Sequence, residues 1–398
     1  MIDDKFLRGL PNKIALVHEW FLPASSGGAE KVVEALDKLL TFEGKSPDLF
    51  SLVEEESINK NSWLFKRKIN TSFIQSLPYG KKKIQNYLPI LPFAIEQLNL
   101  TDFSIVISSS HLVAKGVLTS PEQLHVSYVH TPARYAWDQM YVYLENSKLA
   151  RSPLSPLIRW QLHSFRQWDQ LSGARVDSLI ANSRFTARRI LKYWGRTSQV
   201  VHPPVSIDKF IWNDSRDDFY LCVCRLVPNK RVDLLVSAFN KLGLPLLIVG
   251  TGPQQKTLMK YARKNVKFLG HISDEKIASL MSHCRAFVYA GVEDFGIAPV
   301  EAMASGAPVI CFGGGGLLDT VRSIDKVDST PTGLFFDKQE SGSIVETINW
   351  FEERKLWNEL SSEEIRLWSE RFGVDAFNSK FRNALCNSWD RHKEAIKI

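Results

Sequence analysis

The stretch GVEDFGIAPVEAMASG at residues 291–306 has the pattern of a tight turn followed by a helix. It comes directly after the apolar run Ala286–Tyr289, which is typical of a buried strand in a parallel sheet. The helix that it predicts covers Ile297–Ala304, so the backbone amides of Phe295–Val300 would lie at a helix N-terminus. Such an end favours anions through its unsatisfied amides and the helix dipole. The stretch therefore predicts a strand, turn and helix unit that offers a phosphate site.

Two glutamates in this stretch are candidate ligand residues. Glu301 falls about one turn into the predicted helix among apolar neighbours, where an unpaired carboxylate would be costly. Acidic residues at comparable positions bind ribose hydroxyls in dinucleotide sites. Glu293 precedes the helix on the loop that follows the strand. Two solvated glutamates would give the same spacing, but the apolar setting of Glu301 favours a partner.

A basic cluster, CRLVPNKR at residues 224–231, follows the predicted strand Tyr220–Cys224. Ligands of open α/β sheets bind outside the carboxyl ends of the strands, so Arg225 and Lys230 are expected at the same crevice as the Glu293 loop. Two fixed cations there would stabilise a departing diphosphate as its charge grows. The neighbouring Arg231 is expected to be an ordinary surface residue.

Working outward, short apolar runs alternate with helical patterns along most of the chain, which is typical of α/β folds. The first half opens with a strand at Lys13–His18, a small-residue turn at Ser25–Gly28 and a helix at Ala29–Leu40. Further strands are expected in both halves. They are Ser104–Ser108, His125–Val129, Ser178–Ala181, Pro245–Val249, Val266–Leu269 and Pro308–Cys311. Further helices are Val232–Leu242, Gln254–Arg263 and Asp274–His283.

These elements predict two Rossmann-like doubly wound domains that face each other across a cleft. The paired prolines in HPPV at residues 202–205 are expected to form a hinge between them. We therefore place a first domain at 1–205 and a second domain at 206–375. The chain is helical from Gly342 onward, and these C-terminal helices, including the last one at 376–398, are expected to pack back on the first domain.

Composition excludes several classes of protein. The chain has 398 residues, of which 44% are hydrophobic and 23% charged, as in soluble globular proteins. No apolar run approaches the roughly 20 residues needed to cross a bilayer, so a cytoplasmic location is expected. The five cysteines form no CxxC pair and are expected to be reduced.

The formal net charge of +7 suits phosphate-bearing ligands, anionic membranes or nucleic acid equally. Two basic clusters occur early, at residues 66–68 and 81–83, and the second lies among apolar and aromatic residues. Such a stretch can seat a protein on an anionic leaflet, although a solvated surface has the same pattern. Peripheral contact with the inner membrane is therefore one expectation, and no nucleic-acid-binding signature accompanies the charge.

Three weaker features accompany these clusters. Gly27 and Gly28 begin the first helix and would let it approach a ligand closely. Gly250, in GTGP at residues 250–253, and the four glycines at 313–316 follow strands, where tight turning alone would also explain them. His130 ends an apolar strand, and this position is expected to place its side chain at the ligand crevice.

Together, in this order along the chain, these residues resemble the retaining glycosyltransferases of family 4, which have the GT-B architecture. The resemblance covers nearly the whole chain, and it implies that the domain at 1–205 binds the acceptor and the domain at 206–375 binds the nucleotide sugar. It implies that Arg225 and Lys230 hold the donor diphosphate, Glu301 holds the ribose hydroxyls, and Glu293 and His130 contact the transferred sugar. The implied catalytic residues are His130, Arg225, Lys230 and Glu293. The implied donor-binding residues are Gly27, Gly28, Arg225, Lys230, Gly250, Phe295, Gly296, Ile297, Val300 and Glu301.

The stretch HTPARYAWD at residues 130–138 resembles bacterial mannosyltransferases that build surface polysaccharides from GDP-mannose. The resemblance implies a glycan or polyprenyl-diphosphate-linked acceptor, and retention of configuration without a metal or cofactor, because cationic residues and helix amides neutralise the leaving group. Asp319 departs from the family pattern, which more often has a glutamate there.

Other activities remain open. A UDP- or ADP-sugar could replace GDP-mannose, and a nucleotide-sugar epimerase would have the same two-domain architecture. A dinucleotide-dependent oxidoreductase would need G-x-G-x-x-G after the first strand, which residues 25–30 do not supply. A non-catalytic sugar-nucleotide or nucleic-acid binding module is motivated only by the charge.

Overall fold

The computed structural model describes residues 9–11, 13–23, 27–41, 45–146, 151–327 and 330–397. The chain divides into two compact units. Unit 1 comprises Met1–His202 and Phe377–Ile398, and unit 2 comprises Pro203–Ala376. The chain passes from unit 1 to unit 2 within the HPPV stretch in which the sequence places a hinge.

Unit 1 is built on a seven-stranded parallel sheet with the order β3-β2-β1-β4-β5-β6-β7. Strand β1, which lies between β2 and β4, is buried along all eight residues, as expected for a parallel strand that is covered on both faces. The strands are β1 (Ile14–Phe21), β2 (Asp48–Glu54), β3 (Ile69–Thr71), β4 (Ile105–Ser110), β5 (Leu124–Val129), β6 (Ser178–Ala181) and β7 (Gln199–Val200).

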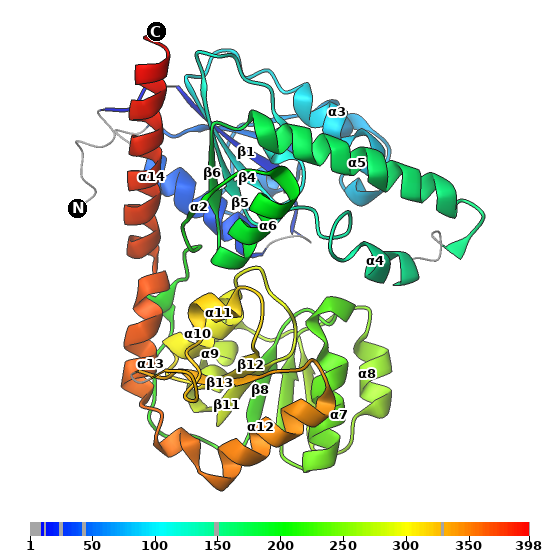
Figure 1. The fold of residues 1–398 in the computed structure, drawn as a ribbon, viewed down its shortest axis with the longest axis vertical. Helices are drawn as coiled ribbons and strands as arrows, with labels where there is room; N and C mark the ends of the chain where they lie inside the picture. The colour runs from blue at the N-terminus through cyan, green and yellow to red at the C-terminus, as the bar shows by residue number, and fades with distance from the viewer. Residues whose placement is uncertain are drawn as a thin grey trace. The chain divides into compact units, whose positions relative to one another are not determined.

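Helices cover the two faces of this sheet. The helices are α2 (Gly28–Leu40), α3 (Leu91–Glu96), α4 (Met140–Asn146), α5 (Ser155–Arg175), α6 (Arg184–Trp194) and α14 (Val374–Ala395). Alternate residues of β1 point to opposite faces, so Leu16 packs in one core with α2 and α14, and Val17 packs in another with α3 and α5. Figure 1 shows α14 beside α2 on one side of the sheet. The predicted return of the C-terminal helix to the first domain is confirmed.

Unit 2 contains a six-stranded parallel sheet with the order β10-β9-β8-β11-β12-β13, which is the doubly wound order that the sequence predicts. Its strands are β8 (Tyr220–Val223), β9 (Leu246–Val249), β10 (Val266–Gly270), β11 (Ala286–Tyr289), β12 (Val309–Phe312) and β13 (Gly333–Phe336). Its helices are α7 (Val232–Leu242), α8 (Gln255–Tyr261), α9 (Asp274–His283), α10 (Ile297–Ala304), α11 (Leu317–Thr320), α12 (Ser341–Glu353) and α13 (Ser362–Ser369).

Several predicted elements are confirmed to the residue, namely β6, β11, α7, α9 and α10. Four strands were not predicted: β2, β3, β7 and β13. Two of these, β3 and β7, are only two to three residues long and lie at the sheet edges, where too few residues pack to leave an apolar pattern. Of the helices after Gly342, α12 and α13 lie in unit 2, and only α14 reaches the core of unit 1.

Two expectations from composition bear on the whole chain. Within the described ranges, no helix is long and apolar enough to span a membrane. All five cysteines are free thiols, and three of them are fully buried among apolar side chains of unit 2. Their burial explains why apolar runs surround them in the sequence.

Candidate functional site

Both sheets have a topological switch point, where strand order reverses and where ligands of open α/β sheets bind. In unit 2 the switch lies between β8 and β11. The loop after β8 carries Arg225 and Lys230, and the loop after β11 carries Glu293 and leads into α10. The structure therefore brings the two main sequence clusters of this unit to one edge of its sheet.

A charged pair lies at the centre of this edge. The Lys230 ammonium forms an ion pair with the Glu293 carboxylate, and both side chains are about one-fifth exposed, at 21% and 18%. The Tyr289 hydroxyl donates a hydrogen bond to the same Glu293 oxygen. Burial, together with the Glu293 carboxylate, raises the pKa of Tyr289 well above its usual range, so this phenol stays a donor at physiological pH. Tyr289 was not predicted as part of the site.

Two glycine turns hold this edge through close backbone contacts. A Cβ on Gly316 would lie 2.2 Å from the Asp294 carbonyl oxygen, and the Gly316 amide donates to the Glu293 carbonyl at 2.7 Å. Gly250 has φ +124°, and a Cβ there would lie 2.0 Å from the Cys224 carbonyl oxygen. These glycines are required for packing between strand-end loops, whether or not a ligand also approaches them.

The first turn of α10 begins at Gly296, whose φ of +96° places it in the left-handed region that favours glycine. Pro299 has no N–H group, and the Val300 N–H donates to the Gly296 carbonyl at 3.4 Å. The range of outward amides predicted for Phe295–Val300 is therefore too wide at its C-terminal end. Ile297 and Ala298 are the helical residues that leave a first-turn amide for an anion.

The other predicted donor residues of unit 2 lie on the loops and helices around this edge. The Arg225 side chain is exposed at the end of β8. Glu301 is half-buried on α10, and Phe295 is buried against Phe372 at a ring distance of 5.7 Å. Asp319 lies on the short helix α11. The structure thus gathers these residues on one unit, and their roles stay predictions.

In unit 1 the switch point lies between β1 and β4, and it contains a carboxylate that was not predicted. Glu19, on β1, is fully buried, and its Oε1 accepts five hydrogen bonds from the residues that end and follow β4. The donors are the Ser110 hydroxyl at 3.1 Å and the backbone amides of His111, Leu112, Val113 and Ala114 at 2.9, 2.8, 3.1 and 3.1 Å. This single oxygen therefore fixes the loop after β4.

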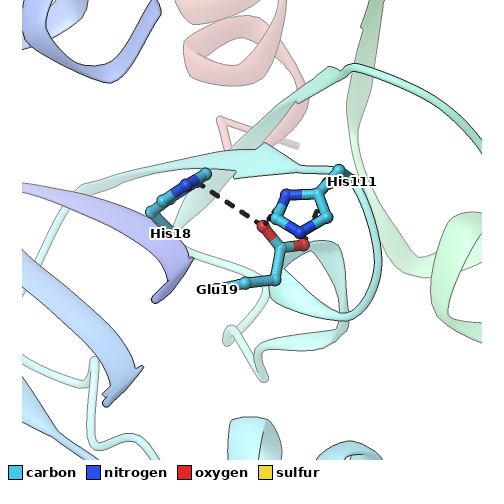
Figure 2. Close-up of side chains that lie close together, drawn as sticks. All are labelled: His18, Glu19 and His111. Atoms are coloured by element: carbon cyan, nitrogen blue, oxygen red, sulfur yellow. Dashed lines mark hydrogen bonds and ion pairs between the residues drawn. The ribbon is translucent and has the colours of Figure 1, made fainter. Parts of the chain in front are cut away.

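The other Glu19 oxygen lies between two imidazoles (Figure 2). Glu19 Oε2 is 3.0 Å from His111 Nδ1 and 3.5 Å from His18 Nδ1. Burial opposes the charge of Glu19, but the charges of His111 and His18 and the hydrogen bonds outweigh it, so the pKa of Glu19 falls well below its usual range. Burial likewise opposes a charge on His18, but hydrogen bonding to Glu30 and the charge of Glu19 raise its pKa.

His18, Glu19 and His111 also form a group that could hold a metal ion, because one ligand atom of each lies within 4.8 Å of the others. The contacts of the histidine nitrogens in this group are also those expected of protonated imidazoles. His18 Nδ1 is 2.9 Å from the Ser109 carbonyl, which requires a donor on that nitrogen, and a metal-bound nitrogen cannot donate. A histidine that carries protons on both nitrogens can donate to Ser109 through Nδ1 and attract the Glu30 carboxylate, which lies 3.8 Å from Nε2.

The predicted residues of unit 1 surround this cluster. Gly27 precedes α2, and its amide donates to Glu30 at 2.9 Å; Ser25 and Ser26 lie outside the described residues. His130 Nε2 is 2.8 Å from the Ser109 hydroxyl at the end of β4. Burial, with help from His18 and His111, lowers the pKa of His130 to about 3, so its imidazole is neutral at physiological pH.

The comparisons with known proteins agree with this architecture. Residues 206–366 match the family described as glycosyl transferases group 1. An uncharacterized glycosyltransferase of Methanocaldococcus jannaschii is 29% identical over 57% of this chain and 60% of its own length. The GDP-Man:Man(3)GlcNAc(2)-PP-Dol alpha-1,2-mannosyltransferase of Candida glabrata is 27% identical over 68% of this chain and 63% of its own length. The chain thus spans about three-fifths of the length of these relatives.

Solved structures show the same fold at low sequence identity. HepE of Anabaena in complex with UDP superposes with a TM-score of 0.67 at 17% identity, over 94% of this chain and 100% of that chain. Sucrose-phosphate synthase of Thermosynechococcus elongatus gives a TM-score of 0.69 at 17% identity, over 95% and 99%. The predicted fold class is therefore confirmed: the chain has the GT-B fold with two Rossmann-like domains, and the match to glycosyl transferases group 1 falls within its second unit.

Proposed function

We propose that this protein is a retaining glycosyltransferase that moves a mannosyl group from GDP-mannose to a glycan or lipid-linked glycan acceptor. The Lys230–Glu293 pair carries the proposal, because it lies at the ligand-binding edge of the domain that matches glycosyl transferases group 1. The choice of GDP-mannose is supported by the relatives whose names state that donor, in Candida glabrata and Corynebacterium glutamicum.

In the proposed reaction the bond between the anomeric carbon and the diphosphate oxygen breaks while the acceptor hydroxyl oxygen bonds to that carbon on the same face. The acceptor proton passes to the departing diphosphate. Lys230, Arg225 and the first amides of α10 neutralise the charge that grows on the diphosphate, in place of a divalent metal. Glu301 binds the ribose hydroxyls, and Glu293 contacts the transferred sugar.

The partners of Glu293 give this assignment a physical basis. Before the donor binds, cations alone at this site would repel one another. The negative charge of Glu293 offsets the positive charge of Lys230 until the donor arrives. The Tyr289 hydroxyl fixes the same carboxylate from the strand side. In unit 1, neutral His130 would hydrogen-bond the sugar without adding charge. Gly27 and Gly28 would let α2 approach the donor.

A donor screen tests the proposal. We expect GDP-mannose to raise the melting temperature of the purified full chain more than UDP- or ADP-sugars do. Selective stabilisation by a UDP- or ADP-sugar would overturn the mannose assignment, and no response to any nucleotide sugar would overturn the donor site. Epimerised nucleotide sugar formed without an acceptor would favour an epimerase. The anomeric configuration of the product, read by NMR, decides between retention and inversion.

We further propose that the protein works against the cytoplasmic face of the inner membrane, where a polyprenyl-diphosphate-linked acceptor would be presented. The supporting surface consists of α4 and the first turns of α5, which extend beyond the sheet of unit 1 (Figure 1). Tyr141, Leu157 and Trp160 are 67%, 60% and 64% exposed there. Residues 140–168 contain four lysines and arginines and one acidic residue, Glu145, so the net charge of the surface suits an anionic leaflet.

The basic clusters at 66–68 and 81–83 support this less strongly. Arg67 forms a two-point ion pair with Asp37, at 2.9 and 3.1 Å, and so holds α2 rather than facing solvent. Lys82 and Lys83 are exposed and remain available.

Vesicle sedimentation tests the membrane proposal. The chain should sediment with vesicles that contain phosphatidylglycerol and not with phosphatidylcholine alone, and Leu157→Ser with Trp160→Ser should abolish this. Met259→Ser with Tyr261→Ser, on exposed positions of α8, is the matched control and should sediment normally. Loss of a dimer in the α5 variant, without vesicle binding in the parent, would assign the surface to a second copy instead.

A further inference from the structure

The environment of Glu19 has the geometry of an occupied anion site. Four consecutive backbone amides, from His111 to Ala114, converge on one carboxylate oxygen at 2.8–3.1 Å. Successive N–H groups that converge in this way form the concave sites that bind phosphates in many proteins. Here the anion is a side chain of the same chain, and it is fully buried.

The position of this site in the fold is also that of a ligand site. The loop 111–114 follows the carboxyl end of β4, beside the carboxyl end of β1, at the switch point of unit 1. Open α/β sheets bind the phosphates of their ligands at this place. At the corresponding edge of unit 2 the cation Lys230 remains partly exposed, whereas unit 1 fills this place with Glu19, the carboxylate drawn in Figure 2.

We propose that Glu19 determines specificity by filling the anion site of unit 1, so that phosphate groups are excluded from this site. A phosphate would have to displace a tethered carboxylate, and Glu30, 3.8 Å from His18 Nε2 on the other side of that imidazole, adds a second negative charge nearby. Unit 1 is then left to a neutral, hydroxyl-rich group. That last consequence rests on the proposed function, whereas the exclusion of phosphate does not.

Emptying the site tests the proposal, with inorganic phosphate as the probe. Glu19→Ala removes the carboxylate and leaves the four amides and the space, whereas Glu19→Gln keeps an oxygen that can accept from them. Both changes are made in a full-length Lys230→Ala background, so that phosphate bound beside Lys230 in unit 2 does not contribute. If that background still responds to phosphate, the response is common to all variants and is subtracted.

We expect the melting temperature of the Glu19→Ala variant to rise with each tenfold increase in phosphate, while the Lys230→Ala parent and the Glu19→Gln variant respond much less. Phosphorus NMR should show line broadening with the alanine variant alone. An alanine variant whose response equals that of the parent overturns the proposal, because its amides would then hold a loop without forming an anion site.

A poorly folded alanine variant is still informative. Its refolding from urea should recover with phosphate or acetate, either of which can replace the missing carboxylate. Asp169→Asn is the matched control, because Asp169 is also a fully buried carboxylate but accepts from Lys115 and two tryptophans rather than from consecutive amides. Failure of both anions to rescue Glu19→Ala, or equal rescue of Asp169→Asn, contradicts the proposal.

Discussion

The two switch points of this molecule share a topology and differ in how they handle charge. In unit 2, Lys230 and Glu293 pair at an edge where both remain partly exposed, so a ligand can compete for either. In unit 1, Glu19 and His18 are fully buried, and one oxygen of the Glu19 carboxylate accepts four backbone amides while the other faces two imidazoles. The difference teaches that a Rossmann-like sheet supplies a place for anions, and that side chains decide whether the place is open.

The largest expected effect follows from removing the cation of the unit 2 site, Lys230. Lys230→Ala should lower kcat/KM for transfer by about 10²–10³-fold, as the loss of one preorganised donor to a developing anion does in other enzymes. The melting temperature should change little, because the side chain is partly exposed. Steady-state kinetics with GDP-mannose would measure the effect.

Arg231→Ala is the matched control for that change. Arg231 is the next residue in the chain, but its guanidinium faces Asp233 at 3.3 Å on the surface. The Arg231→Ala variant should therefore retain near-normal activity. Equal losses in both variants would show that the loop as a whole, rather than the Lys230 charge, supports transfer.

In unit 1, the buried carboxylate of Glu19 should instead make the free energy of unfolding depend on acidic pH. The folded-state pKa of Glu19 lies well below that of the unfolded chain, so its contribution to folding is present above about pH 4.5 and is lost as pH falls through the folded pKa. Glu19→Gln should therefore cost about 2 kcal/mol at neutral pH and flatten the acid limb. Urea unfolding of both proteins at several pH values measures this, and parallel curves would contradict it.

The smallest expected effect concerns His130, which lies beside the Glu19 site of unit 1. Its pKa of about 3 keeps the imidazole neutral, so its NMR signals should not titrate between pH 5 and 8. Because this pKa lies below the unfolded value, its contribution to stability is complete above about pH 6.5 and is lost as pH falls towards 3. His130→Ala should reduce transfer by only about 5- to 10-fold, the value of roughly one hydrogen bond. Titration near pH 6.5 would show that the ring is solvated.

Much of the fold could be predicted from local sequence because the relevant signals are local. The helix α9 begins after Ser273, whose hydroxyl caps it, and α7 ends at Gly243, which has φ +74°. Strand β2 was missed because it opens with the exposed Asp48 and contains a buried Ser51, which break the apolar run. Its burial depends on neighbouring strands that the local pattern does not contain.

The site residues divide in the same way. Lys230 and Glu293 follow strands at recognisable loops, so their approach could be predicted from topology. Tyr289 could not, because a tyrosine that ends a buried strand reads as core. Glu19 was missed because its partners lie 91–95 residues further along the chain, and because β1 continues to Phe21, beyond the predicted end at His18.

The return of α14 to unit 1 has a consequence for biosynthesis. Phe377, Phe381 and Leu385 are part of the core that contains Leu16 and Leu36, yet they are translated after the whole of unit 2. Unit 2 is continuous in the chain and can complete its core while it emerges from the ribosome, whereas unit 1 must wait with part of its core uncovered. A premature stop just before Phe377 would therefore damage the half of the protein that was synthesised first.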